Sequence, residues 1–173
     1  YRILELLYSR FNKKKHEELF TLYYNEHEFR NFNYIIFRLY HGNLYQERHK
    51  IRDSPISDKL IIIKDLLNAL IFLTSESPKI IHADIKPENI LFKSPDSFNI
   101  VLGDFGLSLI LKDEYKNFKN LIQTRWYRSP EIIYQIPFNE KIDMWSFGCI
   151  IYELIAYKPL FKSKYCSDQL VYI

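Results

Sequence analysis

Glycine and cysteine are both scarce in this sequence. None of its four glycines lies in a G-x-G-x-x-G pattern, which lets the backbone approach phosphate groups closely, so the sequence contains no glycine-rich phosphate loop. The two cysteines, Cys149 and Cys166, show no C-x-x-C spacing and have no histidine partner nearby. Neither a metal site nor a disulfide is therefore indicated, and we expect an intracellular protein of the cytoplasm or nucleus.

Long apolar runs and a large charge imbalance are also absent. No apolar run reaches membrane-spanning length and no signal peptide opens the sequence, so we expect no membrane partner. The net charge of +3 is too small to indicate binding to nucleic acid. The sequence instead has 47% hydrophobic and 26% charged residues over 173 positions, which is typical of one globular domain with a buried core.

The most informative stretch runs from Ile80 to Leu107. It combines two carboxylates with a lysine and an amide, namely Asp84, Asp104, Lys86 and Asn89. Short apolar runs around these polar residues predict strands at Lys79–Ile81, Ile90–Phe92 and Asn99–Leu102. Phosphoryl transfer to a hydroxyl needs such a set of groups. One carboxylate takes the hydroxyl proton, a lysine stabilises the moving phosphate, and an asparagine with a second carboxylate holds magnesium.

Several motifs in and after this stretch resemble those of eukaryotic protein kinases. The segment His82–Asn89 is similar to their catalytic loop, and Asp104–Gly106 is similar to their metal-binding motif. Ser129–Glu131 and Asp143–Gly148 follow in the order of that family. A chance collection of polar loop residues is the alternative, and independent motifs in one register argue against it. The resemblance implies an α+β, protein kinase-like fold, mostly the helical large lobe plus the end of the small lobe with its C helix and two strands.

The resemblance also implies a protein substrate and the cofactors ATP and Mg²⁺. Asp84 would accept the proton of the substrate hydroxyl, or orient that hydroxyl for attack. Lys86 would neutralise charge on the transferred phosphate. Asn89 and Asp104 would bind Mg²⁺ through oxygen atoms.

Residues 1–40 are interpreted, by the same resemblance, as a remnant of the small lobe and hinge. Residues 41–173 are interpreted as a large lobe that is incomplete at its C-terminus. In the first part, Phe37 would close the back of the adenine pocket and backbone groups of Leu39 would bond to adenine. Leu91, in the second part, would pack beneath adenine.

Periodicity alone supports a plainer interpretation of the first part. Tyr1–Phe11 has the apolar spacing of a helix, and Phe20–Tyr24 and Asn33–Phe37 are predicted strands separated by a polar turn over Asn25–Asn31. From periodicity alone, an ordinary hairpin with a core phenylalanine is the preferred interpretation, and only the register with the later motifs favours the kinase hinge.

Two longer helices are predicted in the second part. Ser57-Asp58 suits an N-cap, and the apolar positions from Leu60 to Leu73 follow helical spacing. Lys141–Tyr157 is apolar nearly all round, which predicts a buried helix. Asp143 would be costly in such a helix without partners, unless it lies at an exposed helix start. The resemblance implies that it accepts backbone N–H bonds from the catalytic loop. It also implies structural roles for His82 and Phe105.

Between the two predicted helices, the sequence differs from most kinases at several positions. Ala83 stands where most kinases place an arginine that grips a phosphate. A small residue there, together with the segment Gln123–Glu131, resembles the dual-specificity tyrosine-regulated (DYRK) family of the CMGC group. However, Lys119 and Leu121 occupy the places of that family's Tyr-x-Tyr pair, so activation by tyrosine autophosphorylation is not implied.

Three residues of this segment receive roles from the resemblance. Thr124 would bridge Asp84 and Lys86, as in kinases that act on serine and threonine. Arg128 would lie beside the substrate pocket and hold the local backbone. Glu131 would be structural, and we expect it to lack its usual arginine partner, because the last large-lobe helices are not found in the sequence. A buried carboxylate without a partner would destabilise the chain.

Two functions from different classes stay open, beside the less favoured alternative of a relic that keeps the fold but binds no ligand. The first is a protein kinase that transfers phosphate from ATP to serine or threonine, or to tyrosine, of protein substrates. The second is a truncated pseudokinase that binds or scaffolds partners. The complete set of acidic, basic and amide groups favours the first. The missing glycine loop, ATP-binding lysine and C-helix glutamate favour the second, so we expect these 173 residues alone to transfer phosphate poorly.

Overall fold

The computed structural model describes residues 2–10, 18–30, 32–75, 77–111, 122–165 and 168. Its first part contains α1 (Arg2–Arg10), β1 (Tyr23–Phe29), β2 (Phe32–Phe37), α3 (Arg48–Asp53) and α4 (Ile56–Ser75). Its second part contains β3 (Ile80–Ile81), η1 (Pro87–Asn89), β4 (Ile90–Phe92), β5 (Ile100–Leu102), β6 (Leu109–Ile110), η2 (Arg125–Tyr127), α5 (Pro130–Ile133) and α6 (Lys141–Ala156). This mixture of helices and small sheets confirms the predicted α+β class.

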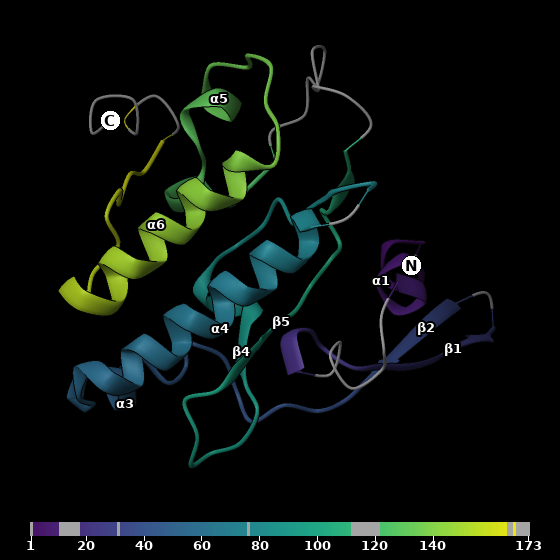
Figure 1. Cartoon of the computed structure of the whole chain (residues 1–173), viewed down its shortest axis with the longest axis horizontal. Coiled ribbons are helices and arrows are strands. Elements are labelled where there is room, and N and C mark those ends of the chain that lie inside the picture. The colour runs from purple at the N-terminus through teal and green to yellow at the C-terminus, as the bar shows by residue number, and fades with distance from the viewer. Residues whose placement is uncertain are drawn as a thin grey trace.

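The strands pair in three separate antiparallel ladders, β1–β2, β3–β6 and β4–β5. Figure 1 shows α1 and the β1–β2 ladder at one end of the molecule, and α3, α5 and α6 at the other. Helix α4 runs through the middle and contacts both β5 and α6. None of the helices in the described part of the chain has the length and apolar composition that a membrane span requires.

The main hydrophobic core extends across these elements. It includes Leu7 of α1, Phe20, Leu66 of α4, Phe92 of β4 and Ile150 of α6, all of them nearly or fully buried. A second, smaller cluster joins Ile81 and Ala83 to Ile122, Ile132, Phe138 and Ile142. Because the segment after β3 contributes to both clusters, hydrophobic packing holds it between α4 and α6.

The hairpin differs from the predicted strands. The first strand begins at Tyr23 and runs to Phe29, through the residues predicted to form a polar turn. Antiparallel pairing uses backbone groups only, so these polar residues pair with Phe32–Phe37 and place the turn at Arg30, whose φ is 48°. Phe20 is not in this strand; it forms a single bridge with Leu102 and is fully buried.

For α4, the predicted N-cap is wrong and the predicted buried face is wrong in part. Helix α4 begins at Ile56, so Ser57 lies inside its first turn and does not cap it. Ile62 is fully buried in α4, whereas Leu60, expected on the buried face, is 55% exposed. The run from Leu60 to Ile63 is entirely apolar and fits several helical faces, so the contacts with β5 and α6 choose the buried one.

Helix α6 is buried over most of its circumference but not all round. Ile142, Phe147 and Ile150 are buried, whereas Met144 and Ile155 are exposed. An apolar residue at every helical position predicts burial only where another element covers that side of the helix.

Candidate active site

A buried aspartate of α6 holds the backbone that follows β3. The Asp143 carboxylate accepts N–H bonds from His82 (Oδ2, 2.6 Å) and from Ala83 (Oδ1, 2.9 Å). Ala83 adopts a left-handed conformation with φ of 63°, which such bonds help to maintain. Burial raises the pKa of Asp143 to about 7, against the opposing effect of these two bonds. Asp143 therefore lies beneath the segment and not at an exposed helix start.

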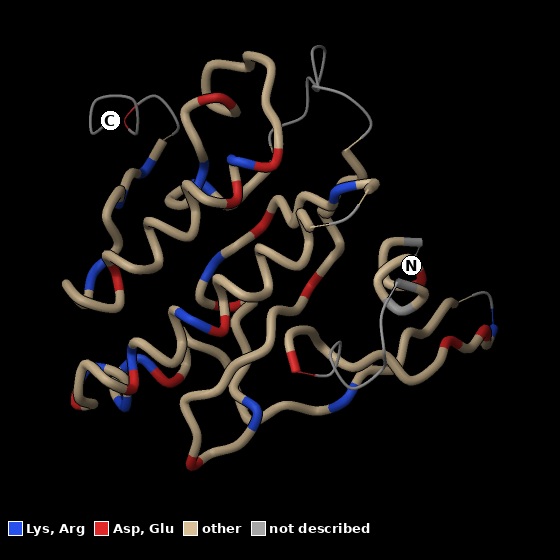
Figure 2. Tube along the Cα trace, viewed as in Figure 1, with Lys and Arg blue, Asp and Glu red and all other residues tan. Residues whose placement is uncertain are grey.

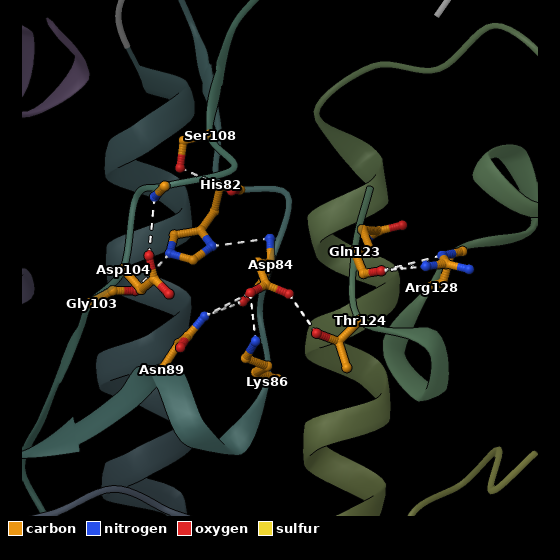
Figure 3. A network of polar contacts seen from close by, with 11 residues as sticks. His82, Asp84, Lys86, Asn89, Gly103, Asp104, Ser108, Gln123, Thr124 and Arg128 are labelled. Carbon is orange, nitrogen blue, oxygen red and sulfur yellow. Dashed lines mark hydrogen bonds and ion pairs between the residues drawn. The ribbon is translucent and has the colours of Figure 1, made fainter. Parts of the chain in front are cut away.

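Three side chains converge on the Asp84 carboxylate (Figure 3). Lys86 Nζ lies 2.7 Å from Oδ2, and Thr124 Oγ1 donates to Oδ1 at 2.7 Å. Asn89 Nδ2 donates to Oδ2 at 3.1 Å and to the Asp84 carbonyl at 2.8 Å. Burial would raise the pKa of Asp84, but the bonds from Lys86 and Thr124 and the lysine charge outweigh it and lower that pKa. Asp84 is therefore ionised at neutral pH.

Thr124 does not bridge Asp84 and Lys86 in the predicted manner. Thr124 and Lys86 bond to different oxygens of the same carboxylate, and among the described residues no hydrogen bond joins them directly. Because a carboxylate has several acceptor sites, Asp84 takes the hydroxyl donor of Thr124 and the ammonium donor of Lys86 at the same time.

His82 links the segment to the Asp104 region. Its Nε2 lies 3.0 Å from the Gly103 carbonyl and its Nδ1 lies 3.2 Å from the Asp84 N–H, so Nε2 donates and Nδ1 accepts. Burial lowers the pKa of His82 to about 4, although the Gly103 bond and the charges of Asp84 and Asp104 oppose this. A neutral imidazole thus joins the two acidic segments. The ring of Phe105 packs against it with a centroid separation of 4.9 Å.

Asp104 directly follows Gly103, whose backbone is hydrogen-bonded to that of Asn89. The Gly103 N–H donates to the Asn89 carbonyl at 2.8 Å, and Asp104 follows with a φ of 60°. Its Oδ1 accepts the Gly106 N–H at 3.1 Å, and the side chain is exposed. The ladder β4–β5 therefore places the two predicted metal ligands at the same end of adjacent strands.

The donor set at this place fits a hard cation. Among the described residues, no donor bonds to Asn89 Oδ1 or to Asp104 Oδ2, so both oxygens can act as ligands. In the same part of the chain, no group of three or more histidine, cysteine or acidic residues could hold an ion by itself. One amide oxygen and one carboxylate, with water and phosphate completing the shell, is a combination that Mg²⁺ accepts.

The predicted hinge residues lie beside β4. The His41 N–H donates to the Phe92 carbonyl, and the Phe92 N–H donates to the Gly42 carbonyl. Leu39 is 95% exposed, and in the described structure neither of its backbone groups is hydrogen-bonded, so both are available to a ligand. Leu91 is half-buried on β4. Phe37, at the end of β2, is exposed, so it is not the core phenylalanine of an ordinary hairpin.

The remaining predicted residues lie after η2. Arg128 is buried and donates to the carbonyls of Ile122 and Gln123, so it holds the local backbone. Glu131 is partly exposed and not buried, so the expected cost of a buried, unpaired carboxylate does not apply. The positions Lys119 and Leu121 lie outside the described residues.

Sequence reasoning missed Gln123. This buried side chain donates from Nε2 to the Ile142 carbonyl and to Ser146 Oγ, both at 2.9 Å, and accepts the Ser129 N–H at 2.9 Å. Its backbone N–H donates to the Ala83 carbonyl at 3.0 Å. Gln123 thus ties the segment after β3, α6 and the start of α5 together. A lone glutamine in a loop gives no sequence signal for such a role.

Comparisons with known proteins agree with this geometry. Residues 7–171 match the family described as protein kinase domain. The chain belongs to the protein kinase family. It is 37% identical, over 175 residues and 99% of its length, to Dual specificity protein kinase YAK1 of Saccharomyces cerevisiae, of which it covers 21%. It is 37% identical over 143 residues to Homeodomain-interacting protein kinase 1 of Caenorhabditis elegans, covering 80% of the chain and 16% of that relative.

Both relatives are kinases of the DYRK type within the CMGC group, which confirms the predicted resemblance. The chain spans 21% of the length of the first relative and 16% of the length of the second.

Proposed function

We propose that this kinase chain transfers the terminal phosphoryl group of ATP to a serine or threonine hydroxyl of a protein substrate. The observation that carries the proposal is the arrangement around Asp84, where Lys86, Asn89 and Thr124 meet one ionised carboxylate. An intracellular location, where ATP is available, belongs to the same proposal.

Each residue has a defined task in this reaction. Asp84 orients the substrate hydroxyl and accepts its proton as the oxygen bonds to phosphorus and the bond to the departing ADP breaks. The low pKa of Asp84 makes it a weak base, so orientation is its larger contribution. Lys86 keeps two further N–H donors beyond its bond to Asp84. These donors would bond to the phosphoryl oxygens.

Asn89 and Asp104 would hold Mg²⁺ through their available oxygens. When bound, the ion neutralises charge on the phosphate groups. The backbone groups of Leu39 would bond to adenine, with Leu91 beneath the ring and Phe37 behind it. The pairing of residues 41–42 with Phe92 brings this hinge beside β4 and supports that arrangement.

A second function, binding without catalysis, is favoured by a different observation. The sequence contains no glycine-rich loop, and no lysine in a V-A-I-K setting paired with a helix glutamate. Without these groups ATP would be bound loosely and its phosphates poorly positioned. We therefore expect slow phosphoryl transfer from these 173 residues alone.

The test is a radiolabelled ATP assay on the purified chain with a generic protein substrate and Mg²⁺. Asp104→Ala and Asp84→Asn should each abolish incorporation. Asp96→Ala is the matched control, because Asp96 is an exposed aspartate in the turn between β4 and β5. Robust turnover that Asp104→Ala abolishes would contradict the expected weakness. Incorporation that neither variant reduces, or none at all, would overturn the catalytic role and leave the binding function.

A further inference from the structure

A cavity of about 850 Å³ opens beside the proposed catalytic residues. Its wall includes Thr124, which donates to Asp84, and Pro87 and Glu88, which directly follow Lys86. From there it extends to α3, η2 and the end of α6, and we call it the α3 cavity. Its volume lies in the range of ligand-binding clefts. A substrate whose hydroxyl reaches Asp84 therefore has this cavity next to its flanking residues.

The wall of the α3 cavity carries an excess of positive charge. Four exposed cations line it, Arg48 and Arg52 from α3, Arg125 from η2, and Lys162. In the described part of the chain, none of the four forms an ion pair with a carboxylate. Figure 2 shows basic positions on α3, with acidic positions on and beside the same helix.

Aromatic rings hold two of these cations at the wall. The Arg48 guanidinium lies 4.8 Å from the centre of the Tyr45 ring, and Lys162 Nζ lies 5.9 Å from that of Trp126. Arg48 and Arg125 each donate to one backbone carbonyl, which leaves further N–H donors for a ligand. The cations are thus positioned but not neutralised.

The opposing negative charge is small. Of the two glutamates in the wall, Glu153 accepts the Tyr127 hydroxyl at 2.7 Å, and burial raises its pKa. Glu88 is exposed and is the acidic side chain nearest the catalytic residues in sequence. Four exposed cations on three parts of the wall outweigh it, so the cavity favours an anionic occupant.

We propose that the α3 cavity binds a segment of the protein substrate rich in aspartate and glutamate, next to the hydroxyl that accepts phosphate. This inference rests on the proposed function. The cations are spread over α3, η2 and the segment after α6, which suits several carboxylates along a chain better than one phosphate group. Tyr45, Trp126 and Leu154 add apolar surface for the stems of the same segment.

Peptide binding without ATP tests this inference separately from catalysis. Fluorescence anisotropy would compare labelled peptides in which one serine is flanked on both sides by glutamate, glutamine or arginine. We expect the glutamate peptide to bind at least tenfold tighter than the other two, with a preference that declines as salt is added. The double variant Arg48→Gln/Arg52→Gln should lose that tenfold preference.

Arg30→Gln is the matched control, since Arg30 is an exposed arginine stacked on Phe29, 5.1 Å from its ring centre, and does not line the cavity. Circular dichroism checks that each variant is folded, and Lys162→Gln replaces the double variant if that one is not. Equal binding of all three peptides, or tightest binding of the arginine peptide, would overturn the inference. So would a loss of preference in Arg30→Gln.

Two further probes distinguish carboxylate side chains from other anionic ligands. A peptide with a single flanking phosphoserine that binds tenfold tighter than the glutamate peptide would overturn the choice of carboxylates. A mixed-sequence RNA that displaces the glutamate peptide more strongly than that peptide displaces itself would overturn the choice of a protein segment. Anionic peptides that bind selectively but are never phosphorylated would count against the proposed function alone. Phosphorylation without selective binding would count against this inference alone.

Discussion

The β1–β2 hairpin and the segment Ile80–Phe92 are both rich in apolar residues, yet their exposure is opposite. In the hairpin, seven large apolar side chains are exposed by 41% to 66%, from Tyr24 to Phe37. In the segment, every residue is buried except Lys86, Glu88 and Leu91. Both regions form antiparallel strands, so strand formation does not explain the difference.

The difference comes from what covers each region. Helices α4 and α6 and the strand β5 surround the segment, and Asp143 from α6 bonds to its backbone. The described residues place no comparable layer over the hairpin. A backbone held on several sides can keep Asp84 in one position, which phosphoryl transfer requires. The comparison predicts that stability depends on the segment and hardly at all on the hairpin faces.

The largest expected effect is that of Asp143→Ala. It leaves the buried N–H groups of His82 and Ala83 without an acceptor, so the free energy of unfolding should fall by about 3–5 kcal/mol. Urea unfolding at neutral pH measures this. Glu140→Ala is the control, because its ion pair with Lys79 lies near the surface and should contribute less than about 1 kcal/mol. Equal losses in the two variants would contradict the anchoring role of Asp143.

A second prediction concerns pH and His82. Its folded pKa of about 4 lies below its unfolded value of 6.5, so its contribution to stability is complete above pH 6.5 and is lost as the pH falls toward 4. Relative to His82→Gln, the wild-type chain should lose about 3 kcal/mol of unfolding free energy over this range. Urea unfolding of both proteins at several pH values gives the difference.

The comparison with His82→Gln is needed because Asp143 acts in the opposite direction. Its raised pKa means that its contribution is greatest at low pH and is lost as the pH rises toward 7. Both proteins keep Asp143, so the difference isolates His82. A constant difference between the two across the pH range would show that His82 does not titrate as proposed.

A third prediction tests how tightly the segment is packed. In Gly103→Ala, the new methyl group would lie 2.6 Å from Thr21 Cγ2 and 3.2 Å from Leu91 Cδ1, so unfolding free energy should fall by about 1–3 kcal/mol. Gly148→Ala is the matched control in α6. Apart from its chain neighbours and the backbone of the same helix, no described atom lies within 4 Å of the added methyl group, so Gly148→Ala should stabilise the helix by up to about 1 kcal/mol. Urea unfolding that finds both substitutions neutral would contradict tight packing at Gly103.

The smallest expected effect belongs to the hairpin. Ile35→Thr on β2 should change the unfolding free energy by less than about 0.5 kcal/mol, because the side chain is exposed and threonine suits a strand. Ile90→Thr on β4, where the side chain is fully buried, should cost about 2 kcal/mol in the same measurement. Similar costs at both positions would mean that the hairpin face is covered in solution.

Much of the candidate site could be predicted from the sequence. Asp84, Lys86 and Asn89 lie within six consecutive positions, so a short loop brings them together, and the strand Ile90–Phe92 has the predicted bounds. The position of Asp104 could also be predicted. Asp104 comes just after the strand β5, and antiparallel pairing of β5 with β4 brings it close to Asn89. Gln123 could not be predicted, because its partners Ala83, Ile142 and Ser146 come from segments far apart in the sequence.

The order of residues along the chain specified the chemistry: which carboxylates, which lysine and which amide lie on loops next to short strands. It also specified that α6 would be apolar around an acidic residue. Packing between distant segments decided which side of α4 is buried and whether the hairpin is covered. It also decided that the Asp143 carboxylate accepts the His82 N–H. Local patterns limit backbone conformation, whereas burial and long-range hydrogen bonds arise only when separate elements come into contact.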